Sequence, residues 1–220
     1  MKRNGGFTLV EVVVVVAIVA LLSAIIVPVI SKQIDEAKIG RAKNECMVIA
    51  SAMNQFYKDV GLWPAAKNNG GARADNALYN LVSGTAVVDI TTATTALSYG
   101  YSAVGNDDWY DGGQTDEVGL VDIMDYHLAQ NKPENTAGAA YPTSGEFYWK
   151  GPYLPAVGKD PWGKYYVCNI RAAYTGTTIL CVVACSGPDG DWDTAKAATT
   201  PALGATASTD DIWVVVTGRP

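Results

Sequence analysis

A single hydrophobic run dominates the start of the chain. Between residues 7 and 27 only Thr8, Glu11 and Ser23 interrupt the apolar side chains. A helix rises about 1.5 Å per residue, so roughly 20 apolar residues cross the hydrocarbon core of a bilayer. Many of these residues are valine, which favours strands in water. In lipid the backbone must satisfy its own hydrogen bonds, so the run predicts a transmembrane helix over residues 7–30.

A second hydrophobic pattern follows, with the period of an amphipathic helix. Its apolar members are spaced alternately by three and four positions: Ile39, Ala42, Cys46, Ile49, Met53, Phe56 and Val60. Such a stripe lies on one face of a helix and typically packs against a core. We therefore expect one helix from residue 7 to about residue 60. Bends are expected at Pro28, which lacks an amide donor, and at Gly40.

Strand-like segments are concentrated near the C-terminus. Lys164–Ile170 and Thr177–Ala184 are rich in β-branched and aromatic residues and flank a glycine-containing turn, which predicts a hairpin. Ile212–Thr217 is a further predicted strand. Two short helices are predicted earlier, around Ala77–Val82 and over Asp116–Gln130.

The order of these elements predicts the fold class. Because the long helix comes first and the strands come last, we expect an α+β fold. The second half of the helix packs on a small antiparallel sheet in this prediction. A long region of helices and loops, residues 65–150, lies between them.

The charges indicate which side of a membrane the bulk of the chain occupies. There are 16 basic and 22 acidic residues, a net charge of −6. This acidic balance argues against nucleic-acid binding by the head, because phosphate contacts need concentrated lysine and arginine. Lys2 and Arg3 precede the hydrophobic run, which places the N-terminus in the cytoplasm and the head outside it.

Four cysteines, Cys46, Cys168, Cys181 and Cys185, would then lie in a compartment that permits disulfides. Cys168 and Cys181 flank the predicted hairpin turn and could face each other, and Cys46 with Cys185 would then tie the helix to the sheet. Three pairings are possible and the sequence does not choose between them. Metal binding is the weaker alternative, because no C-x-x-C pair or nearby histidine supports it.

Glu11 is the anomaly in the hydrophobic run. A carboxylate buried without a partner is unfavourable, so we expect Glu11 to have one. The simpler interpretation is a stray acid near the headgroups of an ordinary membrane anchor. The sharper hypothesis is a positive group on a neighbouring copy, namely a free amino terminus created by cleavage before Phe7.

The segment Lys2–Glu11, K-R-N-G-G-F-T-L-V-E, resembles the prepilin signature of the type IV pilin superfamily. This superfamily includes type IV pilins and the pseudopilins of type II secretion. The resemblance implies cleavage after Gly6, N-methylation of Phe7 and a role for Glu11 in assembly. Pro28 falls where the family often has a helix-kinking proline.

The resemblance also implies a division of the chain. Residues 1–6 form the leader, residues 7–30 the transmembrane and assembly helix, and residues 31–220 a periplasmic or extracellular pilin-like head. No internal repeat is visible.

Later motifs are similar to those of the major pseudopilin of type II secretion: Leu62–Pro64, Gly151–Leu154, Asp160–Gly163 and Ser186–Gly190. In that family the last of these begins a calcium loop. The tentative calcium ligands are Asp189, Asp191, Asp193, Asp210 and Asp211. Carboxylates suit Ca²⁺, which takes six to eight oxygen ligands, but a solvated acidic turn is the alternative.

The family implies a structural role rather than an enzymatic one. The subunit would wait in membrane lipid at the bacterial inner membrane and then enter a helical homopolymer. Expected partners are the prepilin peptidase, the inner-membrane assembly platform and minor pilins or pseudopilins. The filament is either a periplasmic pseudopilus driving protein export or an extracellular pilus for adhesion, motility or DNA uptake. The calcium-like loop and Asp160–Gly163 favour the first, which is the function we expect, whereas the long middle region and the cysteines favour the second.

A membrane-tethered binding module is the rival from another class, with Trp109, Trp149 and Trp192 gripping a ligand. A second acidic loop, Asp107–Gly112, could also bind an ion. No enzyme motif is present, and His127, the single histidine, has no neighbour that suggests a triad or a ligand set. We expect His127 to be a core or surface residue.

Overall fold

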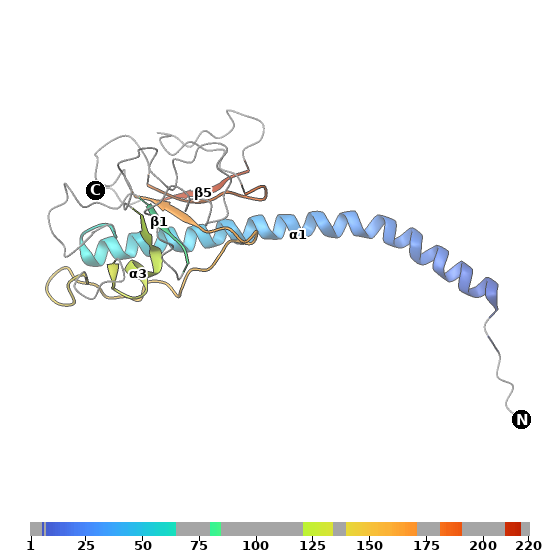
Figure 1. The fold of residues 1–220 in the computed structure, drawn as a ribbon, viewed down its shortest axis with the longest axis horizontal. Helices are drawn as coiled ribbons and strands as arrows, with labels where there is room; N and C mark the ends of the chain where they lie inside the picture. The colour runs from blue at the N-terminus through green and yellow to red at the C-terminus, as the bar shows by residue number, and fades with distance from the viewer. Residues whose placement is uncertain are drawn as a thin grey trace, which may run out of the picture. The chain divides into compact units, whose positions relative to one another are not determined.

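The computed structural model describes residues 6, 8–64, 80–84, 121–133, 140–170, 181–190 and 210–216. The chain divides into two compact units, residues 1–40 and 41–220. Helix α1, Leu9–Val60, begins in the first unit and ends in the second (Figure 1).

In the first unit, the predicted apolar helix is confirmed. Its large hydrophobic side chains from Leu9 to Ile34 are between 48% and 79% exposed, so none of them is covered by the part of the chain that the structure describes. Among the described residues, α1 is the one helix long and apolar enough to cross a membrane, with a mean hydropathy of 3.2 in its most apolar window. Pro28 and Gly40 do not end α1, which continues through both.

In the second unit, the predicted apolar stripe is confirmed from Ala42 to Val60 and forms the buried face of α1. Ala50 and Ala52 join it, because their small side chains flank the stripe and are also covered. Ile39, which we expected to begin the stripe, is 41% exposed and does not belong to it.

A five-stranded sheet forms the rest of the second unit. Its strands are β1 (Asn80–Val82), β2 (Val121–Ile123), β3 (Val167–Asn169), β4 (Val182–Cys185) and β5 (Ile212–Val215). The strand order is β2-β1-β3-β4-β5. The predicted hairpin is β3–β4 and the predicted last strand is β5, so both are confirmed. The sheet is mixed rather than antiparallel, because β1 and β2 pair in parallel.

Of the two predicted short helices, the first is wrong and the second is confirmed only in part. The segment expected around Ala77–Val82 supplies β1, and the segment expected over Asp116–Gln130 supplies β2 followed by α3 (Met124–Leu128), a helix of five residues. Apolar runs this short have no period that separates strand from helix. Pairing with β3 decides the conformation of β1, a long-range contact that local sequence does not encode.

The core lies between the buried face of α1 and one face of the sheet. The register places four buried or partly buried side chains in a row across it: Leu81, Cys168, Val183 and Val214. Leu81, Cys168 and Val183 belong to the same hydrophobic cluster as the α1 stripe, and Val214 packs against that cluster. Strands of three or four residues therefore depend on this shared apolar face for their stability.

Aromatic rings close the C-terminal end of α1. Phe56 is fully buried, with edge-to-face contacts to Tyr141 at 4.8 Å and Tyr153 at 5.5 Å between ring centroids. Gly61 then ends the helix with φ +72°, and its amide donates to the Tyr57 carbonyl at 2.8 Å. This is the left-handed cap that glycine adopts without strain, and it confirms the predicted helix end.

Replacing Phe56 by Ala should lower the free energy of unfolding of the second unit by about 3–5 kcal/mol, because it leaves a cavity between two tyrosine rings. The matched control is Met47→Ala on the same helix, where the side chain is 45% exposed and we expect a change within about 0.5 kcal/mol. Urea titration of the full chain in detergent, followed by aromatic fluorescence, measures both. Equal effects of the two substitutions would contradict this core assignment.

Candidate functional site

The first candidate site is the start of α1. The Thr8 amide and hydroxyl each donate to Glu11 Oε2 at 3.0 Å, and the Glu11 amide donates to Thr8 Oγ1 at 3.3 Å. This reciprocal arrangement is a capping box, in which two side chains satisfy amides at the helix start that have no partner in the helix.

This cap changes the interpretation of Glu11. The carboxylate has two donors within its own chain, so it does not depend on a neighbouring copy for every hydrogen bond. The sequence analysis missed Thr8, although its spacing from Glu11, T-x-x-E, is the signature of a capping box. Gly6 is exposed, and Phe7 lies outside the described residues. Cleavage after Gly6 and methylation of Phe7 therefore stay predictions.

The second candidate site is one end of the sheet. Since β4 is antiparallel to both β3 and β5, the chain entering β3, the chain leaving β4 and the chain entering β5 meet at the same edge. These segments are residues 160–164, 186–190 and 210–211, and we call them the three-loop end. They contain two of the motifs on which the pseudopilin resemblance rests.

Asp160 organises the first of these loops. Its Oδ1 accepts hydrogen bonds from the amides of Trp162 at 3.0 Å and Lys164 at 2.8 Å. The Asp160 amide also donates to the Lys164 carbonyl at 2.8 Å. Burial raises the pKa of Asp160, and the hydrogen bonds from the turn oppose that shift. The aspartate of this motif is therefore a structural residue that folds the turn.

The other two loops are in direct contact. The Asp189 amide donates to Asp210 Oδ2 at 3.2 Å. Gly187 has φ +67°, and a Cβ at that position would lie 2.3 Å from the Asp210 carbonyl oxygen, so only glycine fits. A Cβ on Gly190 would lie 2.7 Å from Lys164 Cε, which shows that the first loop approaches the second.

The structure thus brings together some of the predicted calcium ligands. Asp189 and Asp210 meet, and Asp211 follows in the chain, whereas Asp191 and Asp193 lie outside the described residues. Within the described part of the chain, no three acidic, histidine or cysteine side chains are grouped closely enough to hold a metal. Calcium binding therefore stays a prediction.

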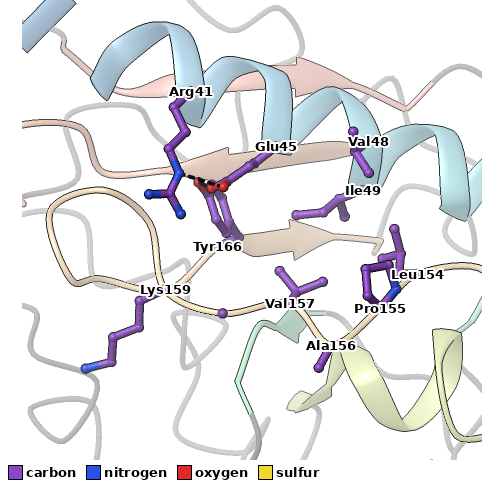
Figure 2. A pocket seen from close by; sticks show the side chains of 11 residues that line it. Arg41, Glu45, Val48, Ile49, Leu154, Pro155, Ala156, Val157, Lys159 and Tyr166 are labelled. Atoms are coloured by element: carbon purple, nitrogen blue, oxygen red, sulfur yellow. Dashed lines mark hydrogen bonds and ion pairs between the residues drawn. The ribbon is translucent and has the colours of Figure 1, made fainter. Parts of the chain in front are cut away.

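A cavity of about 310 Å³ lies between the α1 surface from Arg41 to Ile49 and the loop 154–159 (Figure 2). Arg41 Nε donates to Glu45 Oε1 at 2.8 Å, and the Tyr166 hydroxyl donates to Glu45 Oε2. Burial and the hydrogen bond to Glu45 raise the pKa of Tyr166. Both oxygens of the Glu45 carboxylate are engaged by protein donors, and the remaining wall is mostly apolar, so this cavity presents no base to a substrate.

His127 is a core residue, as one of the two predicted alternatives has it. It is fully buried, with Nδ1 2.6 Å from the Tyr141 hydroxyl and Nε2 2.8 Å from Asp122 Oδ2. The second carboxylate oxygen of Asp122 accepts from the Ile123 amide at 2.7 Å. The sequence analysis recognised neither partner. Since the imidazole does not reach solvent, this triad holds β2, α3 and the Tyr141 segment together.

Trp149, one of the proposed ligand-gripping residues, belongs to the same part of the core. Its Nε1 donates to the His127 carbonyl at 3.1 Å, and its ring meets Tyr153 edge-on at 5.8 Å. Trp109, Trp192 and the acidic loop Asp107–Gly112 lie outside the described residues.

The structure tests the predicted cysteine pairings in part. Cys46 on α1 and Cys185 on β4 are both fully buried in the same hydrophobic cluster, so the pairing of helix with sheet stays a prediction that this burial allows. Cys168 does not face Cys181 directly across the hairpin. Cys168 and Cys181 are equally far from the turn assumed from the sequence. The observed register is shifted from that arrangement and pairs Cys168 with Val183. The four cysteines are not joined by a disulfide in this structure.

Comparison with known proteins shows which proteins this chain is similar to, which the geometry alone does not. Residues 1–27 match the prokaryotic N-terminal methylation motif. The chain carries the N-terminal motif of type IV pilins. This pilin-like chain is 35% identical over 66 residues to type II secretion system core protein G of Pseudomonas aeruginosa, covering 30% of the chain and 46% of that protein.

Two pilins are also similar. The toxin coregulated pilin of Vibrio cholerae is 32% identical over 83 residues, covering 36% of the pilin-like chain and 37% of that pilin. The type IV major pilin protein PilE of Neisseria gonorrhoeae is 29% identical over 73 residues, covering 33% and 44% respectively. The matches span less than half the length of each relative. No solved structure matches the chain significantly.

Replacing Gly187 by Ala should loosen the three-loop end, because the new methyl group would overlap the Asp210 carbonyl and φ is positive. We expect faster hydrogen exchange in residues 186–190 and 210–211, with the rest of the sheet unchanged. Gly158→Ala is the matched control, since a Cβ there meets no atom within 4 Å. Equal exchange in the two variants would show that these loops do not pack as described.

Proposed function

We propose that this chain is a structural subunit of a type IV pilin-like filament and not an enzyme. The observation that carries the proposal is the methylation motif over residues 1–27, continuous with an exposed apolar helix. Relatives from both a secretion system and surface pili support the same general role.

The exposed half of α1 supplies the assembly surface in this proposal. Apolar side chains from Leu9 to Ile34 surround the helix rather than forming one stripe. A helix that is apolar all round is stable in lipid or among other apolar helices. Removal of residues 1–6 leaves this surface embedded in the membrane, and packing against copies of the same helix then replaces lipid when the subunit enters the filament.

Glu11 sets the register between copies. In the single chain its carboxylate is capped by Thr8, so membrane storage does not leave it without donors. On assembly, the amino group at Phe7 of a neighbouring copy adds a charged donor to the same carboxylate. A hydrogen bond between charged groups is stronger than one between neutral groups, which favours this added contact in an apolar core.

Of the two filament types, we propose the pseudopilus of a type II secretion system. The turn built by Asp160 and the packed loops at Gly187 and Asp210 are the motifs that resemble the major pseudopilin. A surface pilus for adhesion, motility or DNA uptake is the second candidate, favoured by the similarity to two pilins. The contacts of Trp149 argue against a tethered ligand-binding module, because this side chain packs against the core.

Calcium at the three-loop end is part of the same proposal. Carboxylates of Asp189, Asp210 and Asp211, with those of Asp191 and Asp193 close by in the sequence, offer the oxygen donors that Ca²⁺ prefers. Two observations support the fit. The Asp189 amide already meets the Asp210 carboxylate, and the buried Ser186 hydroxyl has no hydrogen-bond partner among the described residues. The ion would fix the chain leaving β4 to the chain entering β5.

Replacing Glu11 by Ala in the native cell should abolish filaments while the processed chain stays in the inner membrane, because the apolar helix is intact but its intermolecular contact is lost. Electron microscopy and mass spectrometry of the N-terminus measure these two outcomes. Glu36→Ala removes an exposed carboxylate from the same helix and should assemble normally.

The phenotype of the same Glu11→Ala strain separates the two filament types. A pseudopilin variant stops protein secretion and leaves twitching motility intact, whereas a surface pilin variant does the reverse. Normal filaments in this strain, or a purified chain that still begins at Met1, would refute the filament proposal.

Replacing Asp210 by Asn should weaken Ca²⁺ binding at least tenfold, because a charged oxygen ligand becomes a neutral one. Isothermal titration of the full chain in detergent with CaCl₂ measures the affinity, and Glu146→Gln, an exposed carboxylate away from these loops, is the control. Undetectable binding to the unmodified chain would leave the acidic turn as a solvated loop.

A further inference from the structure

Cys46 and Cys185 come from distant parts of the chain and meet in the core. Cys46 lies on the buried face of α1, and Cys185 is the last residue of β4. Both are fully buried in the same hydrophobic cluster. Cys185 follows Val183 by two positions on β4, so it lies on the face of the sheet that packs against α1. The two cysteines are 139 positions apart (185 minus 46), so a bond between them would close a long loop that contains β1 to β4.

The other two cysteines are arranged differently. Cys168 on β3 is opposite Val183, and Cys181 precedes Val183 by two positions on the same face. Diagonal neighbours in an antiparallel pair have Cα atoms about 7–8 Å apart, beyond the usual span of a disulfide. The pairing of Cys46 with Cys185 therefore stands out among the three possible pairings.

We propose that Cys46 and Cys185 form a disulfide that fastens α1 to the central part of the sheet in the exported protein. The inference rests on the proposed function, since that places the second unit outside the cytoplasm, where disulfides persist. Two buried thiols could also be simple core packing, because cysteine behaves as a small hydrophobic residue. The experiment below separates these two readings.

The bond forms by exchange with the disulfide of a dithiol oxidase. One cysteine thiolate attacks the disulfide of the oxidase and releases one of its sulfurs as a thiolate. The second cysteine then attacks the mixed disulfide. The two cysteines lose two electrons and two protons in total, and the disulfide of the oxidase is reduced to a dithiol.

Packing determines when this exchange takes place. Cys46 and Cys185 are both fully buried in the folded unit, so an oxidase does not reach either thiol there. The bond therefore forms before α1 packs on the sheet. Once formed, it is shielded from reductants by the same core.

The test is a disulfide map of the full chain isolated from the native host, with thiols blocked by N-ethylmaleimide at lysis. Trypsin places Cys46 in the peptide Asn44–Lys58, Cys168 in Tyr165–Arg171, and Cys181 with Cys185 in Ala172–Lys196. We expect the first and third peptides to be linked, and to separate on reduction.

Matched variants assign the bond. The double variant Cys168→Ala/Cys181→Ala should keep the linked peptides, whereas Cys46→Ala and Cys185→Ala should each lose them. Reduction of the unfolded chain, followed by refolding in reductant, should lower the melting temperature of the parent by several degrees and leave that of Cys46→Ala/Cys185→Ala unchanged. If a variant fails to fold, the disulfide map of the unmodified chain still tests the proposal.

The outcomes also distinguish this inference from the filament proposal, because the same sample reports the mature N-terminus. A chain that begins at Phe7 and forms filaments, but carries N-ethylmaleimide on both Cys46 and Cys185, overturns the disulfide and leaves the filament proposal intact. A link through Cys168 overturns it as well. A linked chain that still begins at Met1 supports the disulfide and refutes the filament proposal.

Discussion

Burial of the apolar stripe of α1 is the constraint on which the second unit depends. The described strands contain only three or four residues each, too few for a ladder of hydrogen bonds to stabilise a sheet alone. What they share is an apolar row, from Leu81 to Val214, that packs together with the residues of α1. At roughly 25 cal/mol per Å² of buried apolar surface, that common face outweighs any single hydrogen bond in the unit.

Beyond the ends of the strands, buried polar side chains provide hydrogen-bond partners for the loop backbone. Ser83 is fully buried and donates to the Gly158 carbonyl at 2.8 Å while accepting from the Tyr166 amide at 2.9 Å. Asp125 accepts from the Val157 amide at 2.9 Å, although burial raises its pKa. With Asp160, these residues provide the partners that buried loop amides need in the absence of a neighbouring strand.

Whether an element or contact could be predicted from the sequence depends on how far apart in the chain its interacting residues lie. The helix, the β3–β4 hairpin and β5 have local signals, namely spacing, β-branched runs and an intervening turn, and all three were predicted. Strands β1 and β2 depend on partners more than 40 positions away, and three apolar residues carry no period. At the sites, the Thr8 cap was readable from its spacing. The partners of His127 and the loop contact at Gly187 were not, because they exist only once the sheet has formed.

The burial of His127 has a consequence for the outer surface of the proposed filament. It is the single imidazole in the chain, and it is sealed inside the core. Exposed histidine is the side chain whose ordinary titration falls between pH 5 and 8. The electrostatic coat of a fibre made from this subunit is therefore set by carboxylates, lysines and arginines, and mild acidification of the surroundings should leave its charge nearly constant.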